Sequence, residues 1–201
     1  MTPDLGNMNP SRSTRGRSGT SILSVRTARM TVPPGVTTGL PLLFRVGIGN
    51  DLHRLADGRK LILGGVRIPF DKGPVGHSDG DVVAHAICDA LLGAARLGDI
   101  GRHFPNTSPQ WKNASSLLFL RHVRQLLDAA GYSIVNIDAT VGLERPKLAP
   151  HILHMERKVA AALALKPGQV SVKAKSGEGL DAVGRGEAIR ADAVALIQAC
   201  P

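Results

Sequence analysis

The sequence predicts a single domain over residues 44–201 in which strands and helices intermix, of the α+β or α/β class. Segments with the two-residue period of a strand occur between segments whose apolar residues recur at helical spacing. Hydrophobic residues make up 43% of the chain and charged residues 20%, which is typical of a globular protein. Because aromatic residues make up only 3%, we expect a core of Ala, Val, Leu and Ile.

Strands open the predicted domain. The run LFRVGIG, from Leu43, predicts a strand, and GNDLH begins at its last residue, Gly49. Side chains alternate along a strand, so Asp51 and His53 are expected to point the same way. RKLILGGVRIPF predicts two short strands joined by a Gly-Gly turn, and KGPVGHSDG predicts a loop. A helix is predicted over residues 81–98, with Ser78 or Asp79 as its N-cap.

The second half of the domain continues the mixture. Residues 98–113 predict a long loop, and residues 114–131 a helix that ends at Gly131. Residues 132–143 alternate as a strand, and residues 149–165 predict a helix stopped by the Pro-Gly pair at 167–168. Residues 169–176 predict a strand, whereas residues 187–199 fit either a helix or a strand.

Residues 1–43 differ in composition from the rest, and we expect a disordered N-terminal extension. The segment holds five arginines, no lysine and one acid, so it carries +4 of the net charge of +9. An Arg- and Ser-rich, acid-poor segment is also typical of an organelle transit peptide. The Ala- and Arg-rich body favours a bacterial cytoplasm, and a plastid is the alternative if residues 1–43 are a transit peptide.

Composition argues against several classes of protein. A pI near 10.3 invites a nucleic-acid partner, but the charge lies largely in the extension and aromatic residues for base stacking are scarce. Cys88 and Cys200 do not make a disulfide framework. No apolar run reaches the length of a membrane span. We therefore expect neither a nucleic-acid nor a membrane partner.

A candidate metal site combines two segments. Asp81, His85 and Asp89 recur every four residues on one face of the predicted helix, and either aspartate could orient an imidazole. Asp51, His53 and His85 together offer one carboxylate and two imidazoles, the three-ligand pattern of a catalytic zinc site with an open fourth position. The alternative is a solvated polar face on each element.

Two glycine-rich segments are candidate anion sites. GHSDGD, residues 76–81, precedes a helix whose free N–H groups and dipole attract anions, with His77 and Ser78 as further donors. KAKSGEG, residues 173–179, combines phosphate donors with Glu178, a carboxylate that could hold Mg²⁺. An ordinary capped helix and a charged surface turn are the alternatives.

These segments, in this order, resemble the cyclodiphosphate synthases of the non-mevalonate isoprenoid pathway. The similarity runs through RVGIGNDLHRL, HSDGDVVAHAICDALLGAA with the GDIG and FP that follow it, ERPKLAPHI and VSVKAKSGEGLDAVGRGEAI. The resemblance implies an α+β fold with a four-stranded mixed sheet and helices on one side, assembled as a homotrimer with active sites between subunits. It also implies a cytidine diphosphate substrate, 4-diphosphocytidyl-2-C-methyl-D-erythritol 2-phosphate, which is cyclised with release of CMP.

The resemblance also implies roles for particular residues. Zn²⁺ or another divalent cation would bind Asp51, His53 and His85, and Glu178 would ligate a Mg²⁺ or Mn²⁺ that bridges substrate phosphates. Ser176 and Asp89 are the catalytic candidates. The substrate would be bound by His77, Ser78, Asp99, Ile100, Gly101, Leu143, Lys147, Leu148, Ala149, Lys175, Ser176 and Arg185.

Two other functions fit parts of the sequence. A zinc phosphoesterase would use the same Asp-His-His set with water as the nucleophile, and Asp81 is the candidate general base. A basic nucleic-acid-binding protein is favoured by the pI alone.

Overall fold

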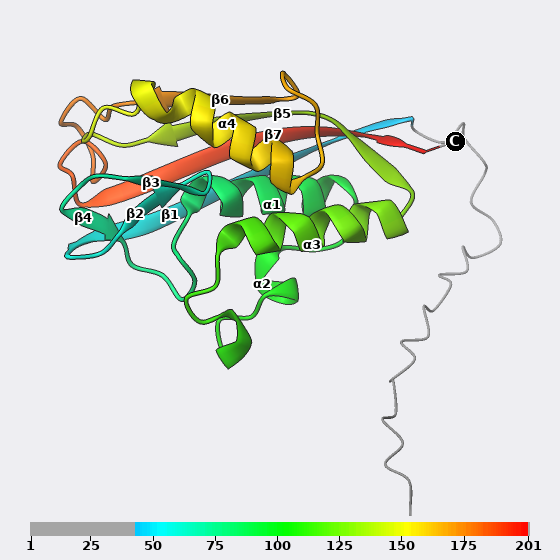
Figure 1. Cartoon of the computed structure of the whole chain (residues 1–201), viewed down its shortest axis with the longest axis horizontal. Coiled ribbons are helices and arrows are strands. Elements are labelled where there is room, and N and C mark those ends of the chain that lie inside the picture. The colour runs from blue at the N-terminus through cyan, green and yellow to red at the C-terminus, as the bar shows by residue number, and fades with distance from the viewer. Residues whose placement is uncertain (1–42, 201) are drawn as a thin grey trace, which may run out of the picture. The chain divides into compact units, whose positions relative to one another are not determined.

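The computed structural model describes residues 43–200, which form one sheet covered by helices and a separate small hairpin (Figure 1). The elements in chain order are β1 (Phe44–Asp57), β2 (Leu61–Leu63), β3 (Val66–Ile68), β4 (Lys72–Pro74), α1 (Val82–Ala94), α2 (Ile100–His103), the 3₁₀ turn η1 (Pro109–Trp111), α3 (Ser116–Ala129), β5 (Tyr132–Gly142), the 3₁₀ turn η2 (Ala149–His151), α4 (Ile152–Ala162), β6 (Val170–Lys175) and β7 (Ala188–Ala199).

The main sheet is mixed and has five strands, in the order β4-β1-β7-β5-β6. Only the β5–β6 pair is parallel. The implied number of four strands is wrong by one, because the three-residue strand β4 pairs with the end of β1 at Leu55–Asp57. That short edge strand falls in the stretch for which the sequence predicts a loop.

The helices cover one face of the sheet. Gly49, Ala193, Ala139 and Val172 lie side by side on β1, β7, β5 and β6, and so share a face. Helix α1 packs on β1 and β7 at this face, and α4 packs on β6, where Glu156 accepts a hydrogen bond from the Val172 amide (Figure 1). This confirms the prediction of helices on one side of an α+β domain.

The other face of the sheet is exposed and partly apolar in the single chain. Besides Phe44 (53%) at the start of β1, its large exposed side chains on β1 and β7 are Val46 (69%), Ile48 (74%), Leu52 (61%) and Val194 (45%). Exposed apolar patches of this kind are typical of interaction surfaces. We refer to these four residues as the apolar sheet face.

Two glycines of β1 bring helix α1 into direct contact with the strand. A Cβ atom at Gly47 would lie 2.0 Å from the Ala90 carbonyl oxygen, and one at Gly49 would lie 2.1 Å from that of Ala86. Only glycine permits such close approach of two backbones. The GxG pattern in RVGIGNDLH therefore sets the spacing between α1 and the strand that carries Asp51 and His53.

The structure corrects two predictions about elements and decides a third that the sequence left open. Helix α1 begins at Val82 with Asp81 as its N-cap, in place of Ser78 or Asp79. The predicted loop at 98–113 contains the short helix α2 and the turn η1. The ambiguous segment 187–199 forms strand β7, which lies in the middle of the sheet between β1 and β5.

Within residues 43–200, every helix is too short or too polar to cross a lipid bilayer. Residues 1–42 lie outside the described part of the chain. The predicted disordered extension and transit peptide therefore remain predictions.

Candidate metal centre and pocket

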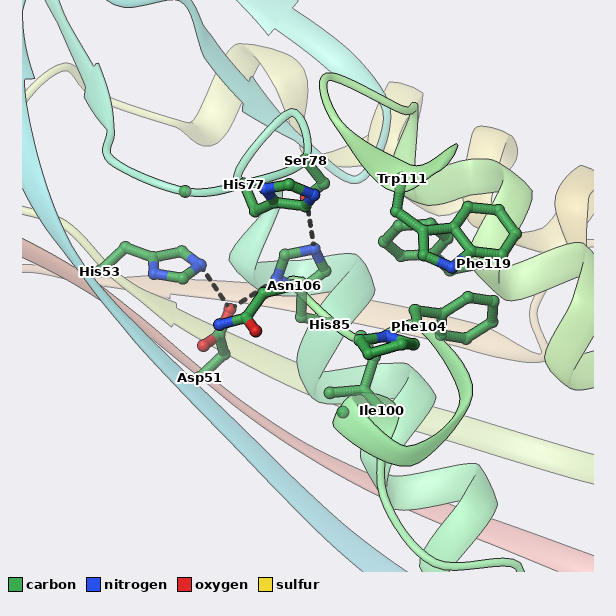
Figure 2. A pocket seen from close by; sticks show the side chains of 13 residues that line it. Asp51, His53, His77, Ser78, His85, Ile100, Phe104, Asn106, Trp111 and Phe119 are labelled. Carbon is green, nitrogen blue, oxygen red and sulfur yellow. Dashed lines mark hydrogen bonds and ion pairs between the residues drawn. The ribbon is translucent and has the colours of Figure 1, made fainter. Parts of the chain in front are cut away.

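Asp51, His53 and His85 come together as the spacing predicts. The first two residues lie on the face of β1 that α1 covers, and His85 reaches them from the first turns of α1 (Figure 2). Asp51 Oδ2 lies 2.8 Å from His85 Nδ1 and 3.1 Å from His53 Nε2. One ligand atom from each residue lies within 4.8 Å of the other two, the only such His/Cys/Asp/Glu group among residues 43–200.

The three residues fit a divalent cation. His53 Nε2 is buried and has no aligned hydrogen-bond partner, although Asp51 Oδ2 is near it. The Leu52 amide donates to Asp51 Oδ1 at 3.0 Å, which leaves Oδ2 turned toward both imidazoles. Two imidazole nitrogens and one carboxylate oxygen facing a common point are the ligands of a three-residue zinc site.

Electrostatics within the group favour charged forms. Burial alone would raise the pKa of Asp51, but its contacts with His53 and His85 lower that pKa below its usual range. Burial alone would lower the pKa of His85, yet the Asp51 carboxylate raises it. A bound cation would take the place of the positive charge that the His85 imidazole otherwise supplies.

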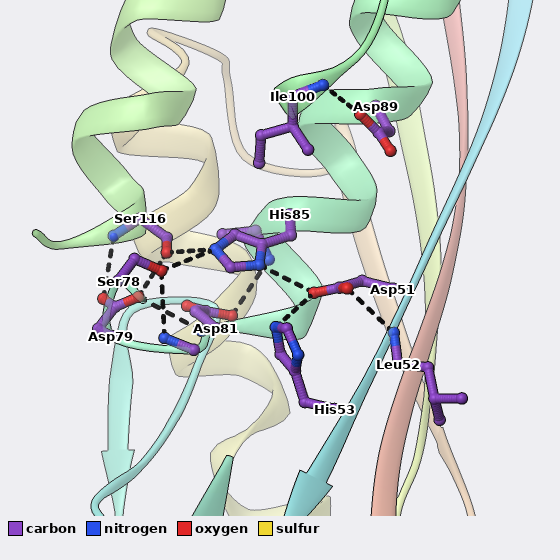
Figure 3. A network of polar contacts seen from close by, with 12 residues as sticks. Asp51, Leu52, His53, Ser78, Asp79, Asp81, His85, Asp89, Ile100 and Ser116 are labelled. Carbon is purple, nitrogen blue, oxygen red and sulfur yellow. Dashed lines mark hydrogen bonds and ion pairs between the residues drawn. The ribbon is translucent and has the colours of Figure 1, made fainter. Parts of the chain in front are cut away.

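The far side of His85 is held by Ser78, which the sequence singled out as an anion donor, and by Ser116, which it did not indicate. His85 Nε2 lies 3.1 Å from Ser78 Oγ and 2.9 Å from Ser116 Oγ, and Asp79 Oδ1 accepts a hydrogen bond from the Ser116 hydroxyl (Figure 3). Ser116 begins α3, thirty-one residues from His85, so helical spacing carried no signal of this contact.

Neither aspartate expected to orient an imidazole does so. Asp89 Oδ1 accepts a hydrogen bond from the Ile100 amide at 2.7 Å, which ties the start of α2 to α1. Burial raises the pKa of Asp89, and the bond from Ile100 opposes that rise. The structure thus gives Asp89 a contact with the backbone of the predicted substrate segment at 99–101 rather than with a metal ligand.

Asp81 holds two backbone segments together. Its carboxylate accepts hydrogen bonds from the amides of Gly64 at 2.9 Å, Gly65 at 2.6 Å and Ala84 at 3.1 Å. Burial and the neighbouring Asp79 charge raise the pKa of Asp81 to about 6, and these three amide bonds oppose the rise. Asp81 therefore caps α1 and anchors the turn between β2 and β3.

This cap changes the expected anion site at GHSDGD. The first turn of α1 already holds the Asp81 carboxylate, which would repel a second anion at the same amides. His77 and Ser78 instead face a cavity of about 470 Å³ beside the metal group. Their side chains, and not the helix end, are the donors that this segment can offer to an anion.

The cavity joins the metal group to an aromatic wall (Figure 2). It is lined by Asp51, His53, Gly76, His77, Ser78, His85, Ile100, Gly101, Phe104, Pro105, Asn106, Trp111 and Phe119. Phe104 stacks on Phe119 with ring centroids 4.3 Å apart, and Trp111 packs edge-on against both. The sequence held a signal for this wall, because two of its four Phe and its one Trp fall within residues 104–119.

Of the predicted substrate residues near GDIG, Ile100 and Gly101 line the cavity. Asp99 is the N-cap of α2, and its Oδ1 accepts a hydrogen bond from the Arg102 amide at 2.9 Å. Residues 99–101 therefore contribute the Ile100 side chain and the Gly101 backbone to the cavity wall.

The remaining predicted residues do not line this cavity within one chain. Leu143 and Leu148 are buried in the core, so their side chains are not available to a ligand. Arg185 forms an ion pair with Glu187 and lines a separate hollow with Leu52 and Ala182. The residues outside the cavity are Asp89, Asp99, Leu143, Lys147, Leu148, Ala149, Lys175, Ser176, Glu178 and Arg185.

Glu144, which the sequence did not single out, links two of these segments. Its Oε2 accepts a hydrogen bond from the Gly177 amide at 3.1 Å, and the Leu143 amide donates to the Lys175 carbonyl at 2.9 Å. The predicted cytidine segment and the predicted phosphate loop are therefore adjacent, on the ends of the parallel strands β5 and β6.

Comparison with known proteins gives a consistent result. The chain is 55% identical over 155 residues to the 2-C-methyl-D-erythritol 2,4-cyclodiphosphate synthase of Chloroherpeton thalassium, covering 77% of this chain and 99% of that protein. It is 57% identical over 154 residues to the protein of the same name from Desulfosudis oleivorans, covering 77% and 92%.

A solved structure of 2C-methyl-D-erythritol-2,4-cyclodiphosphate synthase in a CDP-bound form superposes with a TM-score of 0.71. It is 39% identical and the match covers 77% of this chain and all of that one. The model of the YgbB family matches residues 44–198. The chain therefore belongs to the YgbB family, together with these cyclodiphosphate synthases.

Proposed function

We propose that this protein converts 4-diphosphocytidyl-2-C-methyl-D-erythritol 2-phosphate to 2-C-methyl-D-erythritol 2,4-cyclodiphosphate and CMP, as the names of its relatives indicate. In this reaction the 2-phosphate of the substrate attacks the β-phosphorus of the diphosphate, and CMP leaves. No water is consumed, so the protein is a lyase of the non-mevalonate isoprenoid pathway. We assign this activity to residues 44–201.

One observation carries the proposal. The ligand atoms of Asp51, His53 and His85 converge at one side of a cavity that His77 and Ser78 also line. A metal site that opens on hydroxyl and imidazole donors suits a ligand with phosphate groups. The family membership and the CDP-bound relative point to a cytidine diphosphate compound as that ligand.

We propose Zn²⁺ at the Asp51, His53 and His85 group, and Mg²⁺ or Mn²⁺ at Glu178. When bound, these cations supply positive charge that offsets the repulsion between substrate phosphates. The chain's own residues position the reacting groups, which is the main part of catalysis in phosphoryl transfer.

Several side chains are already fixed for this task. His77 Nε2 lies 3.0 Å from the Ser108 carbonyl oxygen, so the ring is held at the cavity edge. The Ser78 hydroxyl lines the cavity beside His85, where it can donate to a phosphate oxygen. The wall of Phe104, Trp111 and Phe119 keeps water from one side of the cavity and strengthens these interactions.

We further propose that the active protein is a homotrimer with each site shared between subunits. The apolar sheet face would be covered by neighbouring subunits, which accounts for four large apolar side chains at 45–74% exposure. The cytidine segment, Lys147 to Ala149, and the phosphate loop, Lys175 to Glu178, would then reach a neighbour's metal group. Their absence from the cavity of one chain supports this arrangement.

Within the shared site, we assign Ser176 to a phosphate oxygen, and Lys175 and Arg185 to further phosphate contacts. Leu143 and Leu148 have buried side chains, so we assign the base contacts of this segment to its backbone. Asp99, Ile100 and Gly101 would contact the methylerythritol hydroxyls, with Asp89 fixing that segment through the Ile100 amide.

The zinc phosphoesterase alternative loses its candidate base. Asp81 has no exposed surface, and its carboxylate is already bound by three backbone amides. It therefore cannot remove a proton from a water molecule in the cavity. The cyclisation needs no such base for water, because the nucleophile is a phosphate of the substrate itself.

The reaction can be tested by following phosphorus resonances. The purified full chain is incubated with the cytidylyl substrate, Zn²⁺ and Mg²⁺, and the products are assigned by ³¹P NMR. We expect equal amounts of cyclic diphosphate and CMP. Inorganic phosphate as the main product would overturn the proposal in favour of hydrolysis.

We place the protein in a bacterial cytoplasm, on the composition of the body given above. The plastid alternative rests on the extension, which lies outside the described residues. Mass spectrometry of the native N-terminus decides between the two, since a removed extension would indicate import.

A further inference from the structure

His85 is held on the side away from Asp51 by a chain of hydrogen bonds that no ligand role explains. We propose that Asp79 and Ser116 are positioning residues that orient the His85 ring so that its Nδ1 lone pair faces a bound cation. The inference rests on the metal site of the proposed function. It adds two residues, from a loop and from α3, to those that determine how well that site binds its cation.

This chain of hydrogen bonds links residues from three segments that are distant in sequence. His85 Nε2 lies 2.9 Å from Ser116 Oγ, and the Ser116 hydroxyl donates to Asp79 Oδ1 (Figure 3). The Ser116 amide donates to Asp79 Oδ2 at 2.9 Å, so both carboxylate oxygens contact this serine. Ser116 has no exposed surface, and only 9% of His85 is exposed.

The direction of each hydrogen bond, from donor to acceptor, follows from Asp79 at one end and His85 at the other. Asp79 as a carboxylate only accepts hydrogen bonds, so the Ser116 hydroxyl proton is directed toward it. The Ser116 oxygen is then left to accept, and His85 Nε2–H is the donor that faces it, with Ser78 Oγ as a second and longer contact at 3.1 Å. An imidazole with its proton on Nε2 has its lone pair on Nδ1, the atom that lies 2.8 Å from Asp51 Oδ2.

The stacked ring of Phe119, with its centroid 6.1 Å from that of His85, limits tilting of the imidazole. The serine and the aspartate determine rotation within the ring plane. Loss of a partner that hydrogen-bonds to a metal-binding histidine typically lowers metal affinity by about 10- to 100-fold. Here the serine hydroxyl carries that effect from the carboxylate to the ring.

A purely structural role for Ser116 is the competing explanation, since it lies at the start of α3. Capping alone would need only the bond from the Ser116 amide to Asp79 Oδ2. The bond from the Ser116 hydroxyl to Asp79 Oδ1 adds nothing to the helix end, and it leaves the Ser116 oxygen facing His85 Nε2. The two explanations differ in what loss of the hydroxyl does to metal binding by the folded protein.

The test measures Zn²⁺ affinity of the folded full chain by competition with a chelator. We expect Ser116→Ala to bind Zn²⁺ about 10-fold or more weakly, and Ser116→Thr, which restores a hydroxyl, to recover most of the affinity. The matched control is Ser115→Ala, because Ser115 is exposed and its side chain makes no cap hydrogen bond. Unchanged affinity in Ser116→Ala at temperatures where it remains folded would overturn the proposal.

A second measurement uses the wild-type protein, so it does not depend on whether a variant folds. In proton NMR of the Zn²⁺-loaded wild-type protein, the His85 Nε2 proton is expected as a slowly exchanging signal close to the Ser116 β protons. A rapidly exchanging Nε2 proton, or one without that proximity, would contradict the chain of bonds. Neither measurement depends on turnover, so a protein that binds Zn²⁺ in this way without forming cyclic diphosphate would refute the proposed function alone.

Discussion

At the scale of single residues, the metal group was predictable and its support was not. Asp51 and His53 follow from strand alternation, and His85 follows from its place on a buried helix. The contacts of His85 with Ser78 and Ser116 depend on how α1 meets the next helix, which no local pattern encodes. The part that sequence reasoning missed therefore consists of tertiary contacts.

The first prediction at this scale concerns His85→Ala. Removal of one of three ligands should abolish stoichiometric Zn²⁺ and most turnover while the proposed oligomer persists, because His85 lies on the opposite side of β1 from the apolar sheet face. Metal analysis of the purified variant checks this, with His154→Ala on the exposed side of α4 as the control. Retained zinc would show that the third ligand is a different residue.

A second prediction concerns the cap of α1. Asp81→Ala removes the acceptor of the Gly64, Gly65 and Ala84 amides, so the free energy of unfolding should fall by about 2 kcal/mol or more. Urea denaturation measures the change, and Asp57→Ala at an exposed position is the control. A loss below about 0.5 kcal/mol would mean that water replaces the carboxylate at these amides.

At the scale of elements, long periodic segments were predicted correctly and three short or mixed signals were not. Strand β4 has three residues, too few to show a period. Residues 187–199 are rich in alanine, whose small side chain suits both a helix and the strand that α1 packs against. The N-cap of α1 was misplaced because Asp81 is selected by the distant Gly64–Gly65 turn.

The third prediction tests the close approach of α1 and β1. In Gly49→Ala the new Cβ would lie 2.1 Å from the Ala86 oxygen and 2.5 Å from the Ala90 nitrogen, so the helix must move. We expect destabilisation of about 3 kcal/mol and weakened Zn²⁺ binding, since His85 moves with the helix.

The control for that experiment is Gly93→Ala, on α1 itself, where an added Cβ meets nothing within 4 Å. Alanine at this exposed helical position should be neutral or stabilising by up to about 1 kcal/mol. If both variants unfold at the same denaturant concentration as the wild type, the contact between α1 and β1 is not close in solution.

At the scale of the whole molecule, the sequence indicated two parts of a site, the metal group and the segments at 143–149 and 175–178. In one chain the cavity beside the metal group is not lined by either of those segments. Residues 143–149 and 175–178 lie at the ends of β5 and β6, whereas the metal group lies on β1 and α1. In the trimer that we propose, the two parts meet only on assembly, which neither periodicity nor a single subunit determines.

The fourth prediction concerns this assembly. Ile48→Glu places a charge on the apolar sheet face, at a side chain that is 74% exposed in the single chain. We expect dissociation of the trimer and loss of turnover, with Zn²⁺ still bound by the monomer. Analytical ultracentrifugation measures the mass, and Leu153→Glu, 57% exposed on α4, should leave it unchanged. A trimer that persists in Ile48→Glu would refute the proposed interface.

The alternation of side chains along β1 places two different requirements on one short stretch of sequence. From Val46 to His53, one set of positions carries the glycines and metal ligands under α1, and the other carries Val46, Ile48 and Leu52 on the opposite face. Insertion or deletion of one residue here would exchange the two sets and damage catalysis and assembly together. Substitutions would damage them one at a time, so along this strand the property that is lost should alternate, residue by residue, between metal binding and assembly.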